Sequence, residues 1–192
     1  MIREQYPHPI VLGSGSPRRK SLLAELGYSF TIRTSDADET PPPHMDGRGI
    51  AEYLAKHKAD HIQTTPEEVL ITSDTVVWHN GESLAKPAHK EDAQRMLLKL
   101  SGNTHEVITG VCLRHDAHHH IFSDVTRVQF KTLDTDDIDY YIDTFKPFDK
   151  AGAYGIQEWI GMIGIEGIEG SYFNVVGLPV QRLDEALRSL VQ

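Results

Sequence analysis

Three observations predict that this sequence folds as an α/β protein. Strand-like and helix-like segments alternate through most of the 192 residues, which is typical of this class. A short buried strand at 10–12 runs through a loop of small residues into a helix. The composition, 39% hydrophobic and 24% charged, is that of an ordinary globular protein, and the length fits one domain or two closely joined lobes.

The first half contains three predicted strands and two predicted helices. Pro17 stands where a first helical residue should, with Ser16 placed as its N-cap. Asp74 stands near the end of the most strand-like stretch, 69–73, and Asn80-Gly81 after the continuing strand predicts a type I′ hairpin. In order, we expect a strand at 10–12, a helix at 17–26, a strand at 29–34, an acidic loop at 36–43, a helix at 50–62 and a strand at 69–78.

The second half begins with a helix that Gly102 ends and closes with a helix that Pro179 opens. The segment 152–170 is too rich in glycine for an uninterrupted helix or strand. In order, we expect a helix at 93–100, two long strands between 105 and 133 around a hairpin at 114–120, a short helix from 135 to 146, the glycine-rich segment, a strand at 172–176 and the closing helix.

The net charge of −9 excludes several classes of partner. A general nucleic-acid binder needs an excess of basic side chains, and a peripheral membrane protein needs clusters of them. No apolar run approaches the roughly 20 residues of a membrane-spanning helix, and residues 1–7 do not resemble a secretory signal. The single cysteine, Cys112, lies in an apolar run and is interpreted as a buried core thiol in a reducing, cytoplasmic setting.

The segment 14–20 predicts a phosphate-binding cradle. Ser14 and Ser16 precede a helix N-terminus, and Arg18, Arg19 and Lys20 follow directly. Free backbone N–H groups and the helix dipole favour an anion there, and arginine suits phosphate oxygens. The alternative is a capped helix with a solvated basic first turn, although these charges oppose the dipole unless an anion compensates. The spacing matches neither a Walker A loop nor a dinucleotide-binding motif.

Carboxylates form the second candidate feature. Asp36, Asp38 and Glu39 lie in the loop after a strand, and Asp74 interrupts a β-rich run where a buried carboxylate is costly without a role. Carboxylates near phosphate suggest a divalent cation, with Mg²⁺ the first choice and Mn²⁺ an alternative. The plainer interpretation of the three loop residues is a solvated surface.

Other polar residues have both a functional and a plain interpretation. Lys58 and Lys86 are candidate phosphate ligands, although each taken singly fits a surface lysine. Gln157 follows a glycine-rich turn and offers a donor and an acceptor to a base edge. His115 and the run 118–120 are interpreted as an exposed hairpin tip, because no complementary ligand is fixed nearby.

Taken together, the motifs resemble those of Maf proteins, in the same order and over nearly the whole chain. The motifs are Leu12-Gly13-Ser14-Gly15-Ser16-Pro17-Arg18-Arg19, Asp36-Ala37-Asp38-Glu39-Thr40, Ser73-Asp74-Thr75, Lys86-Pro87, Ser101-Gly102-Asn103-Thr104-His105, Thr109-Gly110-Val111, the stretch 149–157 and the stretch 170–179. The sequence departs from the family at Thr72 and Ala85, where glycine is usual. Both changes are small and concern the local backbone more than the activity.

The resemblance implies a single Maf-like domain over 1–192, with a mixed sheet between two α/β lobes and an active-site cleft, similar to the inosine triphosphate pyrophosphatases. It implies hydrolysis of a nucleoside triphosphate to monophosphate and pyrophosphate, with Asp74 as proton acceptor. Arg18, Thr75 and Gln157 match the positions that set base preference, as in the subgroup acting on dTTP and UTP rather than 7-methyl-GTP. Glu39, Lys58 and Lys86 match further active-site positions.

These residues give a mechanistic hypothesis. The expected phosphate ligands are Ser14, Ser16, Arg18, Arg19, Lys58 and Lys86, and the expected metal ligands are Asp74 and Glu39. The expected partner is a nucleoside triphosphate, with no nucleic-acid polymer and no membrane. A homodimer is common in related folds, although no apolar stripe requires one. The alternative is a nucleotide-binding regulator of cell division without turnover, which would have no need of a general base.

Overall fold

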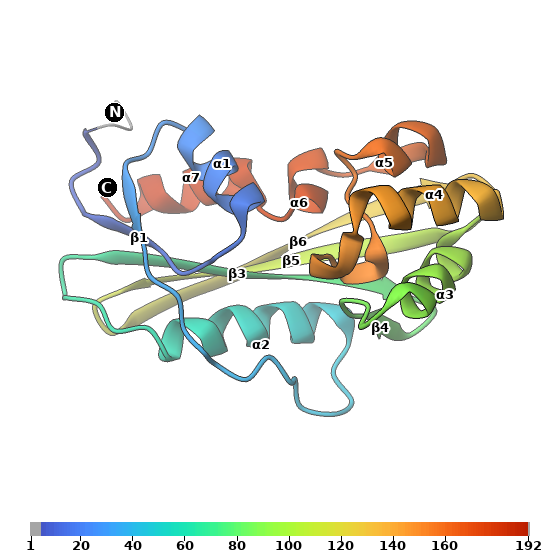
Figure 1. Ribbon diagram of the computed structural model, residues 1–192. Helices are drawn as coiled ribbons and strands as arrows, with labels where there is room; N and C mark the ends of the chain where they lie inside the picture. Colours follow the sequence, from blue (N-terminus) through green and yellow to red (C-terminus); the bar gives the residue numbers. More distant parts are fainter. Residues whose placement is uncertain (1–4, 192) are drawn as a thin grey trace.

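The computed structural model describes residues 5–191. Seven strands form one mixed sheet in the order β2-β1-β3-β5-β6-β7, with β4 paired to β3. Figure 1 shows α2 along one face of the long strands, while α1, α6 and α7 lie on the other. The predicted α/β class is confirmed.

The strands are β1 Ile10–Leu12, β2 Phe30–Ile32, β3 Val69–His79, β4 Glu82–Leu84, β5 Thr104–His115, β6 His118–Phe130 and β7 Ile165–Glu169. The helices are α1 Pro17–Glu25, α2 Gly47–Asp60, α3 Lys90–Leu100, α4 Thr135–Phe145, α5 Trp159–Gly164, α6 Tyr172–Val176 and α7 Val180–Ser189, with 3₁₀ turns η2 Pro147–Asp149 and η3 Ala151–Ala153.

The parallel part of the sheet is short and the antiparallel part is long. β1 pairs in parallel with β2 and with the first residues of β3. β3 also pairs with β5, antiparallel, over the register Val69↔His115 to Trp78↔Glu106, and so extends well beyond the end of β1. Because β1 ends at the level of Ile71, the loop after β1 opens beside the next residues of β3. The carboxyl end of β1 thus lies next to the middle of β3.

Asp74 was expected near the end of the stretch 69–73, with the strand continuing to 78, and the structure joins both parts into the single strand β3. Asp74 pairs with Gly110 in the middle of β3. The continuous pairing with β5 carries the strand past the point where β1 stops. Gly110 also allows α2 to pass close to the sheet, because a Cβ there would lie 2.3 Å from the backbone oxygen of Ala51.

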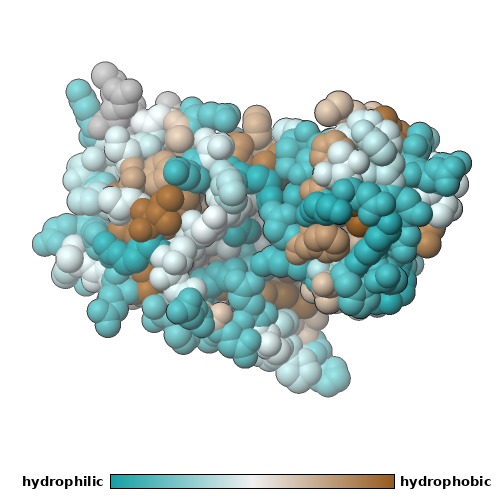
Figure 2. Space-filling model, viewed as in Figure 1, coloured by the Kyte–Doolittle hydropathy of each residue, from teal (hydrophilic) through white to brown (hydrophobic). Residues whose placement is uncertain are grey.

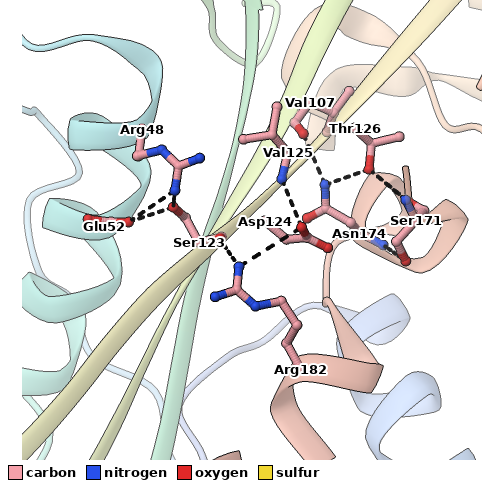
Figure 3. Close-up of polar contacts among 10 residues, drawn as sticks. All are labelled: Arg48, Glu52, Val107, Ser123, Asp124, Val125, Thr126, Ser171, Asn174 and Arg182. Atoms are coloured by element: carbon pink, nitrogen blue, oxygen red, sulfur yellow. Dashed lines mark hydrogen bonds and ion pairs between the residues drawn. The ribbon is translucent and has the colours of Figure 1, made fainter. Parts of the chain in front are cut away.

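The segment 172–176 was expected to be a strand, and it is the helix α6. Its residues have high β propensity, but the Ser171 side chain accepts from the backbone N–H of Asn174 and starts a helix. The fully buried Asn174 amide then donates to the oxygen of Val107 and to Thr126 Oγ1, at 3.0 Å each (Figure 3). Tertiary hydrogen bonds to β5 and β6 therefore override the local preference. The glycine-rich segment 152–170 is interrupted as predicted, but it also contains α5 and β7, which the sequence did not indicate.

Two groups of buried side chains stabilise the two ends of the sheet. One lies beneath α1 and α7 and includes Leu23 and Leu187. The other lies between α3, α4 and α5 and includes Leu97 and Tyr141. Val176 of α6 packs against both. The segment around α6 therefore joins the two groups at the middle of the molecule.

The predictions about Cys112 and about residues 118–120 are confirmed. Cys112 is fully buried, and burial raises the pKa of its thiol to about 11. The residues 118–120 are exposed on the β5–β6 hairpin, whereas His115, which was expected to be exposed with them, is half-buried. Within residues 5–191, no three His, Cys, Asp or Glu side chains are grouped so that they could hold a metal. The same described part of the chain contains no helix long and apolar enough to cross a membrane.

Candidate active site

A cavity of about 360 Å³ lies where the loop after β1 meets the middle of β3. Figure 2 shows this face of the molecule hollowed near its middle, with hydrophilic residues around the hollow. The walls come from the start of α1, from β3, from the segment 149–157 and from the end of α6. All the site residues expected from the sequence line this one cavity: Ser14, Ser16, Arg18, Arg19, Glu39, Lys58, Asp74, Thr75, Lys86 and Gln157.

Three other residues that the sequence suggested, Lys20, Asp36 and Asp38, do not line the cavity. Lys20 is exposed on α1 and does not line the cavity, so the predicted run of three cations contributes two. Asp36 and Asp38 also lie outside the cavity wall. Asp38 instead accepts from the backbone N–H and the hydroxyl of Thr40, at 3.0 and 2.8 Å, and so stabilises the loop. Of the loop carboxylates, Glu39 reaches the cavity.

The N-terminus of α1 faces the cavity. Pro17 occupies the first turn, and Ser16 takes the extended N-cap conformation, as predicted. Ser14 is buried, and its hydroxyl accepts from the backbone N–H of Ser16 at 3.2 Å. The first turn of α1 contains no acidic residue. The positive end of the helix dipole therefore stays available to an anion.

Arg19 joins three segments of the cavity wall. Its Nε donates to the oxygen of Gly177 at 2.8 Å, and its Nη atoms donate to Ser14 Oγ at 3.3 Å and to Thr75 Oγ1 at 3.0 Å. Burial lowers the pKa of Arg19, and the nearby Asp74 acts against that shift. The Thr75 hydroxyl also bonds with that of Thr109 at 3.0 Å. Arg19 thus fixes the geometry of the cavity as well as adding charge to it.

Lys58 lies between the two carboxylates. Its Nζ is 2.6 Å from Asp74 Oδ1 and 3.0 Å from Glu39 Oε1, and Lys86 Nζ is 3.6 Å from the other Glu39 oxygen. Partial burial raises the pKa of Glu39, but Lys58 and Lys86 outweigh burial and lower it overall. Asp74 and Lys58 are each 13% exposed, so their charges face the cavity rather than bulk water. The two carboxylates already hold one cation between them.

The opposite wall contains a second set of ion pairs. Arg18 donates to Asp149 Oδ2 at 2.8 Å, and Lys150 contacts Asp149 Oδ1 at 2.7 Å. Partial burial raises the pKa of Asp149, but these two cations overcome it and hold the pKa at about 2. Gln157 lies exposed beside this network and lines the cavity. Asp149 has no role that could be predicted from the sequence, because its partner Arg18 lies 131 residues away.

A tyrosine from the segment 149–157 also lines the cavity. Tyr154 is buried, and its hydroxyl is 2.7 Å from His105 Nε2. Burial lowers the pKa of His105 to about 3, so the imidazole is neutral near pH 7. A neutral pair of this kind fixes the Tyr154 ring without adding charge.

The fold belongs to a known class of α/β proteins. The structure of a HAM1 protein from Coxiella burnetii is similar to it, with a TM-score of 0.50 and 14% sequence identity, covering 95% of this chain and 99% of that one. The expected fold is thereby confirmed.

Within that class the chain belongs to the Maf family, described as "Maf-like protein", which matches residues 9–190. A protein of Bacteroides fragilis named "dTTP/UTP pyrophosphatase" is 50% identical over 186 residues, covering 95% of this chain and 96% of its own length. A protein of Phocaeicola vulgatus with the same name is 50% identical over 193 residues, covering 99% and 100%. The resemblance inferred from the motifs is confirmed.

Proposed function

We propose that the protein hydrolyses dTTP and UTP to the nucleoside monophosphate and pyrophosphate. The relatives named above support the reaction and the substrates. The single observation that carries the proposal is the placement of Asp74. It brings one carboxylate in contact with Lys58, into the same cavity as the N-terminus of α1 and Gln157. The phosphate-binding cradle, the candidate general base Asp74 and the side chain of Gln157, which reads the nucleobase, then face one ligand.

The triphosphate lies between α1 and the two lysines. The N-terminus of α1 and Arg18 hold phosphate oxygens from one side, and Lys58 and Lys86 hold them from the other. Ser14, Ser16 and Arg19 complete the cradle. Local cations explain how a chain of net charge −9 captures a polyanion. The acidic remainder of the surface disfavours nucleic-acid polymers.

Asp74 and Glu39 would hold the expected divalent cation, Mg²⁺ or Mn²⁺. Their oxygens converge on one cationic group, because Lys58 Nζ lies within 3.0 Å of an oxygen of each carboxylate. Mg²⁺ is commonly bound by one or two carboxylates together with substrate phosphates, so two protein ligands suffice. When bound, such an ion neutralises phosphate charge and polarises the reacting phosphoryl group.

Asp74 orients a water molecule and takes its proton as the water oxygen attacks the α-phosphorus. The bond between the α-phosphorus and the bridging oxygen breaks, and pyrophosphate leaves with that electron pair. Lys58 and Lys86 stabilise the charge that develops on the phosphate oxygens. The chain therefore acts by positioning, charge stabilisation and one proton transfer.

Replacing Gln157 with Ala is expected to weaken base discrimination. The amide offers an acceptor and a donor to the N3–H and O4 edge of thymine or uracil. Its loss leaves base groups unpaired, so the preference for dTTP over dCTP in kcat/KM falls by about 1–3 kcal/mol. Steady-state kinetics with both nucleotides measures this, with Gln181→Ala, an exposed glutamine on α7, as the matched control. An unchanged preference would place base reading elsewhere.

The reaction itself is tested by a pyrophosphate-release assay on dTTP, UTP, CTP, GTP and 7-methyl-GTP, with Mg²⁺ and with EDTA. We expect turnover of dTTP and UTP that EDTA abolishes. Preferred turnover of 7-methyl-GTP would overturn the assignment of substrates. No turnover of any nucleotide would favour a regulator instead.

We also propose a cytoplasmic protein whose substrate is the free nucleotide. The buried thiol of Cys112 is consistent with a reducing compartment. A homodimer is common in related folds, and sedimentation velocity measures the oligomeric state directly.

A further inference from the structure

A single buried hydroxyl holds both ends of the turn that carries Gln157. Tyr141 lies on α4, is fully buried and does not line the cavity. Its hydroxyl donates to Glu158 Oε2 and accepts from the backbone N–H of Gly155 at 3.1 Å. Burial, followed by the contact with Glu158, raises the pKa of Tyr141, so the phenol stays protonated as a donor.

The turn from Gly155 to Glu158 is compact. The backbone N–H of Glu158 donates to the oxygen of Gly155 at 3.0 Å, which puts Gln157 in the third of four positions. A Cβ at Gly155 would lie 2.9 Å from Gln157 Nε2 and 3.0 Å from the Glu158 carboxyl carbon. The amide of Gln157 and the carboxylate of Glu158 thus both lie against the bare backbone of Gly155.

The remaining oxygen of Glu158 is also occupied. Lys150, 9% exposed, places its Nζ 3.0 Å from Glu158 Oε1 and 2.7 Å from Asp149. Asp149 in turn pairs with Arg18 at the start of α1. Contacts therefore run without a gap from Arg18 to the hydroxyl of Tyr141. Gln157 is fixed relative to the anion cradle and not only within its own turn.

We propose that Tyr141 is a positioning residue for base discrimination, because its hydroxyl holds the Gly155–Glu158 turn in the shape that aims Gln157 at the base. This proposal rests on the proposed function, and it adds a residue outside the cavity to the residues that set base preference. A side chain that reads a base edge must be held closely, because a shift of about 1 Å can cost roughly 100-fold in rate. The buried hydroxyl of Tyr141 fixes the turn from the side of the core.

Tyr141→Phe tests the proposal. The ring and its stacking on Phe145 are kept, while both hydrogen bonds of the hydroxyl are lost. We expect the ratio of kcat/KM for dTTP to that for dCTP to fall about tenfold, mostly through a higher KM for dTTP. Tyr140→Phe is the matched control, since the neighbouring tyrosine on α4 is 52% exposed and stacks edge-on against Trp159. The control should keep the wild-type ratio.

The ratio separates positioning from folding. A loss of folded protein lowers the rates for both nucleotides equally and leaves the ratio unchanged. A ratio for Tyr141→Phe within twofold of the wild type would overturn the proposal. The wild-type arm tests the proposed function independently, because a wild type that turns over neither nucleotide contradicts pyrophosphatase activity. In that case calorimetric binding of dTMP and dCMP replaces kinetics, and an unchanged binding ratio in Tyr141→Phe overturns the proposal in the same way.

Discussion

Replacing Asp74 with Asn should lower kcat for dTTP by at least about 100-fold, the usual contribution of a general base. The amide keeps the size of the carboxylate but cannot take the proton from the attacking water. Asp74 is 13% exposed and contacts Lys58 at 2.6 Å, so its side chain is held in place rather than free in solvent. Single-turnover kinetics with the enzyme in saturating excess over dTTP measures the chemical step directly.

Two controls make the Asp74 result specific. Binding of a non-hydrolysable dTTP analogue, measured by calorimetry, should persist, because α1 and the lysines remain. Asp38→Asn changes a carboxylate of the neighbouring loop that lies outside the cavity wall, and should leave kcat unchanged. Turnover by Asp74→Asn at the wild-type rate would show that another group activates the water.

Replacing Lys58 with Met should reduce kcat/KM for dTTP by roughly 100-fold, the order found when one stabilising donor is removed from an active site. The variant keeps a long side chain on α2 but removes the ammonium shared by Asp74 and Glu39. The two carboxylates then lose their common counter-charge, and the triphosphate loses one of its cations. Steady-state kinetics across a range of dTTP concentrations measures both kcat and KM.

The matched control for Lys58 lies half a turn away. Lys56 is on the same helix and pairs with Asp60 at 2.6 Å, with a side chain 45% exposed. Lys56→Met should leave kcat/KM within about twofold, since surface ion pairs contribute little. Equal effects of the two substitutions would mean that Lys58 acts through helix stability rather than through the substrate.

Local signals account for the elements that the sequence predicted well. Pro17 and Ser16 mark the start of α1 within one residue, and Asn80-Gly81 marks the turn between β3 and β4. These signals depend on the backbone preferences of a few adjacent residues. The residues of the candidate site could be predicted for a different reason. Their short motifs occur in the order seen in one family, and the resemblance covers nearly the whole chain.

The features that the sequence could not predict depend on contacts between distant segments. Asp74 lies near the loop after β1 because β3 continues along β5 past the end of β1. The segment 172–176 is helical because Asn174 bonds to β5 and β6. Arg19 joins residues up to 158 positions away. Neither periodicity nor propensity contains this information.

Contacts between distant segments also protect one edge of β6. Among the described residues, no strand pairs with that edge before Arg127. β7 pairs with β6 only from Arg127 onward. Before that point Arg182 of α7 donates to the backbone oxygen of Ser123, and Asp124 accepts from the backbone N–H of Val125 at 3.1 Å (Figure 3). Side chains thus satisfy groups that another strand could otherwise pair with. The sequence pattern alone did not indicate this protection.

In the proposed reaction, water attacks the α-phosphorus of dTTP in the cavity beside Asp74. The decisive experiment is hydrolysis of dTTP in water enriched in oxygen-18, followed by mass spectrometry of the products. We expect one labelled oxygen in dTMP and none in pyrophosphate. Label in pyrophosphate with unlabelled dTMP, or products of dTDP and phosphate, would contradict it.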